Sequence, residues 1–121
     1  MFKKLPRKYF EDMLEYTKDA IEICDLLSFE EFQNSKINYL AAIRCLEVIG
    51  EAANKLPEII LHNYPDVEWK KIISTRNRLI HGYDSISYST VWSIVKQNLP
   101  TLKIQLDTIL TDPNLDSLTI I

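Results

Sequence analysis

Apolar residues recur at alternating three- and four-residue spacing through four long segments of this chain, and this periodicity limits the fold more than any other feature. The segments span residues 7–27, 34–62, 67–81 and 88–110. Such spacing places the apolar side chains on one face of an α-helix, and that face must be buried against another helix. The sequence contains no strand-length alternation, internal repeat or low-complexity stretch. We therefore predict an all-α protein, an antiparallel up-and-down bundle of four main helices.

Polar residues and prolines mark the ends and bends of these helices. The segment Ser28-Phe29-Glu30-Glu31 has the form of a capping box, which predicts a short extra helical turn after the first helix. Asp66 is a suitable N-cap for the third helix, and Ser87 is one for the fourth. Pro57 should kink the last turns of the second helix and Pro100 should bend the fourth, because proline lacks an N–H.

The length and composition fit one globular domain. The chain has 121 residues, of which 46% are hydrophobic and 26% are charged. Residues 1–111 are expected to form a single helical domain, and residues 112–121 a C-terminal tail. Neither a signal-peptide pattern nor an apolar run of membrane-spanning length is present, so we expect a cytoplasmic protein without membrane contact. Cys24 and Cys45 lie on the apolar sides of predicted helices, and we interpret them as buried free thiols.

The net charge of −3 argues against a general nucleic-acid coating protein, which would be strongly basic. Any contact with RNA must therefore be local. The cluster Lys70, Lys71, Arg76 and Arg78 in the third helix is the obvious place for it, although the two lysines fit a solvated helix face equally well.

Arg76 is anomalous because it falls on the apolar stripe of the third helix. That stripe consists of Trp69, Ile72, Ile73, Leu79, Ile80 and Tyr83. A guanidinium keeps its charge at any ordinary pH, so it needs a carboxylate, a phosphate or a cleft open to solvent. His81 lies about 140° away on the polar side, with Asn77 and Arg78. The long Arg76 stem and a helix end at Gly82 could still bring Arg76 and His81 to one cleft.

Two features of the second helix bear on this arginine. Gly50 lies on the inner stripe, where glycine costs about 1 kcal/mol relative to alanine, so we predict close approach of another backbone there. Glu47, Glu51 and Lys55 follow one another at four-residue spacing on the outer face, which fits a ladder of ion pairs in water. Alternatively, Glu47 or Glu51 holds Arg76 in position.

The segment Arg76-Asn77-Arg78-Leu79-Ile80-His81-Gly82-Tyr83 resembles the signature of the HepT-like ribonucleases, a branch of the HEPN superfamily. That signature is Arg, four residues, His, one residue, Tyr. The segments Ile49 to Asn54 and Val91 to Pro100 are also similar to this family, and the resemblance covers residues 8 to 106. It implies a HEPN-like fold, a homodimer with a composite site, and ribonuclease activity. Arg76 and His81 are then the expected catalytic residues, with Asn77, Arg78 and Glu51 in support.

The residues themselves favour the same chemistry. No Gly-rich phosphate loop, clustered metal-ligand pattern or Gly-x-Ser-x-Gly elbow is present, so no metal or cofactor is predicted. In metal-independent RNA cleavage the 2′-hydroxyl attacks its own phosphate, while His81 transfers a proton and Arg76 stabilises the phosphorane. Acid and base catalysis needs two such groups, and His62 fits a surface role near a helix end. We therefore predict a two-fold dimer that faces two motifs across one cleft.

The resemblance also implies control by a partner. In the family the matching tyrosine accepts AMP units from a minimal nucleotidyltransferase antitoxin, so Tyr83 is the expected adenylylation site and this protein the expected toxin of a type VII toxin–antitoxin pair. The alternative for Tyr83 is a core position on the apolar stripe. Two alternatives stay open: a non-catalytic RNA- or nucleotide-binding dimer, and a scaffold subunit for a nucleotidyltransferase partner.

Overall fold

The computed structural model describes residues 5–82 and 86–118, and all regular secondary structure in this part of the chain is helical. The elements in chain order are α1 (Arg7–Asp25), α2 (Phe29–Gln33), α3 (Lys36–Lys55), α4 (Glu58–Leu61), α5 (Trp69–His81), α6 (Tyr88–Ser93), the π-helical segment η2 (Ile94–Asn98), α7 (Leu99–Leu110) and the 3-10 turn η3 (Leu115–Ser117). The all-α prediction is confirmed.

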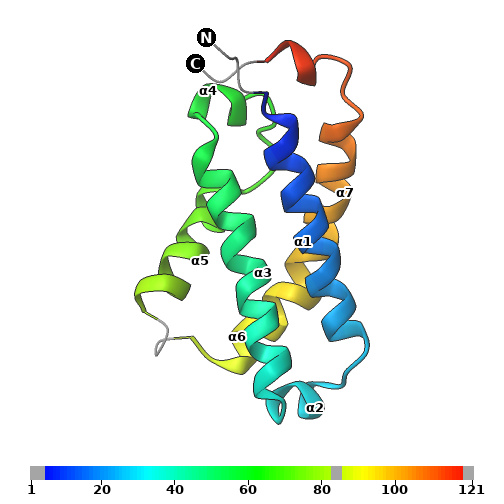
Figure 1. Cartoon of the computed structure of the whole chain (residues 1–121), viewed down its shortest axis with the longest axis vertical. Coiled ribbons are helices and arrows are strands. Elements are labelled where there is room, and N and C mark those ends of the chain that lie inside the picture. Colours follow the sequence, from blue (N-terminus) through cyan, green and yellow to red (C-terminus); the bar gives the residue numbers. More distant parts are fainter. Residues whose placement is uncertain (1–4, 83–85, 119–121) are drawn as a thin grey trace.

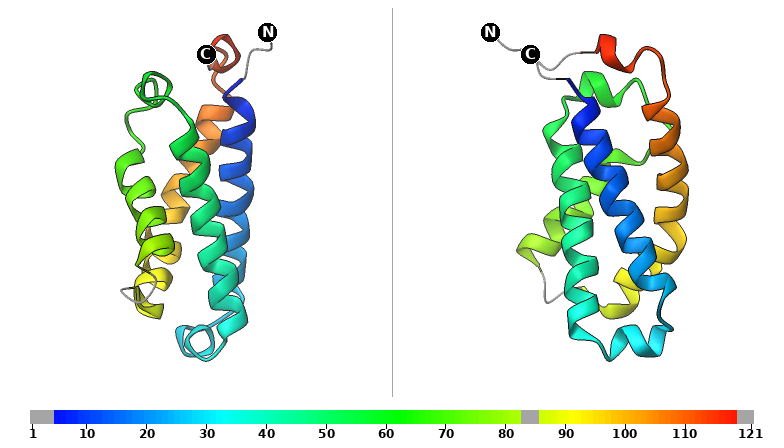
Figure 2. Two further views of the ribbon diagram at one scale, coloured as in Figure 1. Left: turned by 60° about the vertical axis from the view of Figure 1, so that its left-hand side comes forward. Right: turned by 45° about the vertical axis from the view of Figure 1, so that its right-hand side comes forward.

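Four long helical stretches form the bundle: α1, α3, α5, and α6 with η2 and α7 (Figure 1). α3 packs against α1 and also against α5, and α1 packs against α7. The further views show α5 on the outer side of α3, away from α1 (Figure 2). The helix that carries the sequence motif is therefore held mainly by α3.

The core lies between α1, α3 and α7 and is closed by α2 and α6. Its most completely buried large side chains are Phe10, Met13, Phe32, Ile49, Val91, Leu106 and Leu115. Burial of each such side chain stabilises the fold by about 1.5–3 kcal/mol. Cys24 and Cys45 are buried and free, as predicted, and desolvation raises the pKa of each thiol to about 11.

The predicted capping box is present at the start of α2. The Ser28 Oγ accepts a hydrogen bond from the Glu31 N–H at 3.1 Å, and the Ser28 N–H donates to Glu31 Oε1 at 3.0 Å. Ser87 also caps as predicted, because its Oγ accepts from the Thr90 N–H at 3.2 Å. Both caps satisfy backbone donors that a helix start leaves unpaired.

The predicted N-cap of α5 is wrong. The helix begins at Trp69, with Glu68 rather than Asp66 in the N-cap position. The Asp66 backbone carbonyl instead accepts a hydrogen bond from Gln105 Nε2 of α7 at 3.0 Å. A tertiary contact therefore holds this residue outside the helix.

Two prolines interrupt helices, each more strongly than expected. Pro57 ends α3 instead of kinking it, because Leu56 takes an extended conformation with φ −85° and ψ 131°, and α4 then starts as a separate helix. Near Pro100 the bend takes the form of a π-turn, in which the Leu99 N–H donates to the carbonyl of Ile94 five residues earlier.

The last described residues pack on the body of the bundle. Leu115 is fully buried. Arg7 donates from Nε and Nη2 to the two Asp116 oxygens at 2.9 and 3.1 Å, and the hydrogen bond from this guanidinium lowers the pKa of Asp116. The Tyr64 hydroxyl donates to Asp112 Oδ2 at 2.8 Å. The described part of the predicted tail is thus joined to α1 and to the turn before α5.

Candidate active site

α5 ends where the sequence predicts. His81 is its last residue, and Gly82 follows with φ −137° and ψ 46°. The Gly82 N–H donates to the Arg78 carbonyl at 2.8 Å, which closes the last helical turn. The chain therefore leaves the helix directly after His81, without the positive φ that often selects glycine at a helix end.

The stem of Arg76 lies against α3 at Gly50. A Cβ built on Gly50 would collide with the Arg76 Cβ, and it would lie 3.0 Å from Arg76 Cγ and 3.1 Å from the Ile72 carbonyl oxygen. The absence of a side chain at Gly50 thus permits the close approach of α5, as predicted. Because the apolar stem fills this contact, Arg76 can sit on the apolar stripe while its charged head extends beyond it.

The Arg76 guanidinium is only partly hydrogen-bonded. Its Nη1 donates to Asn77 Oδ1 at 2.9 Å. Its Nε is buried and has no partner among the described residues. A buried donor left without a partner costs about 1–3 kcal/mol. Because Nε is buried, an added anion would have to bind at the exposed Nη side of the group.

The two carboxylates considered as partners of Arg76 make no ion pair with it in the described part of the chain. Glu47 Oε2 lies 3.6 Å from Arg44 Nη1 on the same helix. Glu51 is half-buried next to Gly50, with no ion pair to Arg76 within 4.0 Å. The charge of Arg76 is thus left for another group, and a supporting role of Glu51 stays a prediction.

The hydrogen bond to Asn77 links the Arg76 head to a residue on the face of His81. Asn77 and His81 are four residues apart and therefore share one face of α5. His81 is exposed and can meet a substrate. That Arg76 and His81 act at one cleft, although their positions on the helix are about 140° apart, stays a prediction.

Exposed cations surround this pair. Lys70 and Arg78 are exposed on α5, and Lys71 is exposed with its Nζ 3.8 Å from Glu68 Oε2. A long, solvent-exposed ion pair of this kind contributes little stability, so Lys71 can change partners readily. The outer face of α5 is therefore locally basic on a chain whose net charge is −3.

The connection after the site is anchored on α3. Tyr83 lies outside the described residues. The carbonyl of buried Ile86 accepts a hydrogen bond from the Tyr39 hydroxyl at 3.4 Å, and the Tyr39 ring stacks on Tyr88 with 3.9 Å between centroids. Burial raises the pKa of Tyr39, so the hydroxyl stays a donor.

Other candidate groups lie apart from this arrangement. His62 is exposed at the C-cap of α4, the surface role expected of it. Within residues 5–82 and 86–118, no three His, Cys, Asp or Glu side chains gather as a metal site would need. In the same ranges, no helix combines the length and apolar character needed to cross a bilayer.

Known proteins resemble this chain over most of its length. A protein of Methanocaldococcus jannaschii that carries RNase in its name is 38% identical over 112 residues, which cover 93% of each chain. A protein of Thermococcus cleftensis named "Probable ribonuclease HepT" is 33% identical over 101 residues, or 84% of this chain and 92% of that protein. A Caldanaerobacter subterraneus protein, also with RNase in its name, is 36% identical over 107 residues, or 88% and 96%. No solved structure gives a significant match.

The family model described as Ribonuclease HepT-like matches residues 13–109, a range that includes Gly50, Arg76, Asn77 and His81. Together with these relatives, the match shows that this chain belongs to the HepT-like ribonuclease family.

Proposed function

We propose that this protein is a metal-independent endoribonuclease whose active site contains Arg76 and His81. The observation that carries the proposal is the Arg76 guanidinium, which forms no ion pair with a carboxylate of the described residues and donates from Nη1 to Asn77, a residue on the face of exposed His81. Membership of the family supports RNA as the substrate.

The proposed reaction is transesterification within RNA. The 2′-oxygen attacks the adjacent phosphorus and loses its proton to a base, while the bond to the 5′-oxygen breaks and that oxygen receives a proton from an acid. The products are a 2′,3′-cyclic phosphate and a 5′-hydroxyl. Arg76 would bind the non-bridging oxygens, where charge increases in the phosphorane, and His81 suits the proton transfers because imidazole titrates near neutrality.

One His81 per chain is not sufficient for a separate acid and base. A homodimer with two-fold symmetry would supply a second copy of the motif across the same cleft. The partly exposed Ile80, with 39% of its surface accessible, lies one residue before His81 and is available for such an interface. A monomer in light scattering at micromolar concentration would contradict this part of the proposal.

A cleavage assay tests the activity. Purified protein should cleave mixed RNA in the presence of EDTA, and the products should carry 2′,3′-cyclic phosphate ends. His81→Ala and Arg76→Ala should each lower the rate by at least about 100-fold. His62→Ala is the matched control and should cleave normally. Loss of cleavage on adding EDTA, or normal cleavage by His81→Ala, would overturn the mechanism.

The proposed regulation is that of a type VII toxin–antitoxin pair, with adenylylation of Tyr83 by a minimal nucleotidyltransferase. Each AMP unit would add a negative phosphodiester two residues from His81 and compete with RNA for Arg76. Tyr83→Phe should cleave RNA and escape neutralisation by the partner. Full neutralisation of wild type with an unmodified Tyr83, measured by mass spectrometry, would exclude this route.

A non-catalytic role is the second candidate, and the acidic net charge of −3 favours its scaffold form. In that case the protein is an RNA- or nucleotide-binding dimer, or a scaffold for the nucleotidyltransferase. The two candidates differ in one result. The scaffold form would bind the partner normally while wild type and His81→Ala show the same background cleavage.

A further inference from the structure

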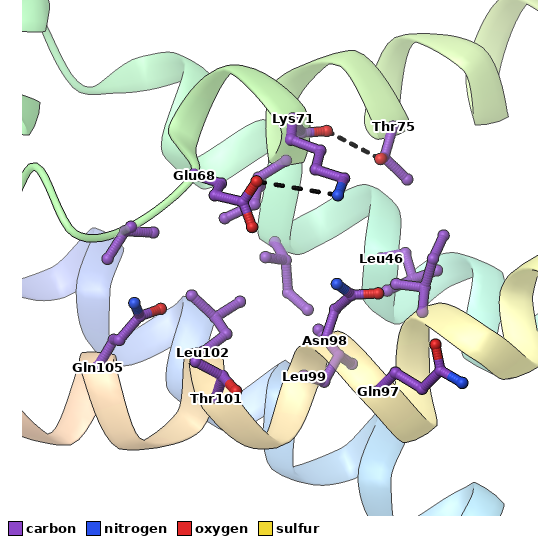
Figure 3. Close-up of a pocket in the computed structure, with 14 residues that line it drawn as sticks. Leu46, Glu68, Lys71, Thr75, Gln97, Asn98, Leu99, Thr101, Leu102 and Gln105 are labelled. Atoms are coloured by element: carbon purple, nitrogen blue, oxygen red, sulfur yellow. Dashed lines mark hydrogen bonds and ion pairs between the residues drawn. The ribbon is translucent and has the colours of Figure 1, made fainter.

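A groove lies between α5 on one side and η2 with α7 on the other (Figure 3). It encloses a free volume of about 170 Å³, and α3 supplies part of its apolar floor through Leu46 and Ile49. The rim carries one lysine and several neutral polar groups, namely Lys71, Thr75, Gln97, Asn98, Thr101 and Gln105.

The π-turn shapes one wall of this groove. Three of its five residues, Ile94, Gln97 and Asn98, line the space. A π-turn inserts one extra residue into a helical turn, and such insertions are frequent at functional sites. The interruption near Pro100 therefore coincides with a binding-sized cavity.

Asn98 is the rim amide for which neither the oxygen nor the nitrogen bonds to a described residue, whereas Gln97 and Gln105 each use one of the two atoms. The Gln97 Oε1 accepts from the Ser93 hydroxyl at 3.1 Å, and Gln105 Nε2 donates to the Asp66 carbonyl at 3.0 Å. The Asn98 side chain has no hydrogen bond to any described residue, and it points into the space between α5 and α7 (Figure 3). Its amide can therefore offer a donor and an acceptor at once.

The size and charge of the groove fit one planar ring. An engineered apolar cavity of about 150 Å³ in another protein accepts benzene, and this groove of about 170 Å³ is slightly larger and open at its polar rim. Its described lining contains a single carboxylate, that of Glu68, which already pairs with Lys71 at 3.8 Å. A phosphate next to the ring could bind Lys71, and Glu68 is the one carboxylate of the described lining that would repel it.

The groove shares α5 with the catalytic motif. Thr75 on the rim directly precedes Arg76, and Ile72 contributes both to the groove and to the contact with Gly50. From Thr75 to His81 the helix rises by about 9 Å. Thr75 and His81 also point about 120° apart around α5, so an RNA strand that reaches both would follow the helix surface.

We propose that this groove is a subsite for one unstacked nucleobase of single-stranded RNA, with Asn98 bonding to the base edge and Lys71 facing the adjoining phosphate. Unpaired bases are commonly recognised by insertion against apolar surfaces together with hydrogen bonds to their edges. Asn98 is then a specificity-determining residue. The proposal rests on RNA being the substrate, as proposed above.

Binding to catalytically inactive protein tests the subsite without depending on cleavage. The His81→Ala protein should bind the four hexanucleotides rA6, rC6, rG6 and rU6 with different affinities in fluorescence anisotropy. Adding Asn98→Ala should reduce the preference among them by about tenfold, the usual effect of losing a two-bond amide contact. Adding Thr101→Trp should fill the groove and weaken the preferred oligonucleotide by a similar factor. Thr108→Trp, on the same helix outside the groove, is the matched control and should bind normally.

The outcomes separate this proposal from the proposed function. If the groove variants change oligonucleotide preference while wild type cleaves no RNA, the subsite stands and the nuclease proposal fails. If wild type cleaves RNA and the groove variants alter neither affinity nor cleavage position, the subsite proposal is overturned. The proposal would also be overturned if light scattering showed a dimeric wild type and a monomeric Thr101→Trp protein, because the groove would then belong to the contact with a second copy.

Discussion

Gly50 of α3 and Arg76 of α5 form one contact that joins helix packing to the proposed chemistry. The Arg76 Cβ occupies the space in which a side chain on residue 50 would lie. The same arginine directs its Nη1 to Asn77 and leaves its Nε without a partner in the described part of the chain. Gly50, which has no side chain, therefore positions a cation of the proposed active site.

Replacing Gly50 by alanine should destabilise the fold and should also lower the rate of RNA cleavage. Alanine favours the helix by about 1 kcal/mol, but overpacking costs about 1–3 kcal/mol, so the net loss should reach about 2 kcal/mol in urea unfolding. The cleavage rate should fall by more than this loss of unfolding free energy explains, because the displaced group is Arg76. Asn54→Ala, at an exposed site on α3, is the control. A more stable Gly50→Ala protein with normal cleavage would show that the contact is not required.

Arg76→Met should separate activity from stability. Methionine keeps an apolar stem against Gly50 and removes the buried Nε donor, so stability in urea should stay equal or rise by about 1 kcal/mol. RNA cleavage should fall by at least about 100-fold. Arg76→Lys retains the charge without the planar fork and should have intermediate activity. Marked destabilisation of Arg76→Met would mean that the guanidinium has a structural partner.

Asn77→Ala should lower kcat by about tenfold with little change in KM, because Asn77 acts by directing Arg76 and not by binding RNA. Lys70→Ala is the contrasting variant. Lys70 is exposed on the same helix, so its loss should raise KM and reduce the salt dependence of RNA binding. If Asn77→Ala shifts KM alone, its proposed positioning role is incorrect.

The buried thiols predict a loss of stability at alkaline pH. Desolvation raises the pKa of Cys24 and of Cys45 from 9.0 to about 11. As pH rises through 9, the unfolded chain releases these protons first, so their contribution to stability is complete below pH 9 and is lost as pH approaches 11. Urea midpoints should fall over this range, and less steeply after Cys24→Ala and Cys45→Ala. Iodoacetamide should leave both thiols of the native protein unmodified at pH 8. Rapid alkylation there would contradict their burial.

Local sequence signals predicted the features that depend on neighbouring residues. The Ser28 capping box and the end of α5 at His81 are of this kind. The start of α5 was not predictable in this way. The Trp69 indole N–H donates to the Tyr64 carbonyl at 2.9 Å, and the Asp66 carbonyl accepts from Gln105 thirty-nine residues later in the chain. The second of these bonds is tertiary, and it overrides the local preference of Asp66 for an N-cap.

The same distinction applies to the candidate site. The motif identified Arg76 and His81 because its residues are close in sequence. Gly50 was identified as a close-contact position, but its partner could not be named, because residues 50 and 76 meet only when α3 and α5 pack. The groove beside the π-turn was missed entirely, since it requires three helices to be placed in space.

The ion pair between Arg7 and Asp116 also has a consequence for protein engineering. It brings the first and last described helical elements together at 2.9 Å, although the two residues are 109 positions apart. A short linker between these ends should therefore permit circular permutation, with new termini opened in the exposed turn at Pro65 and Asp66. The permuted chain would begin with α5. Comparing its unfolding free energy with that of the original chain would show how far the packing of α5 depends on its covalent link to α4 and how far on its contact with α3.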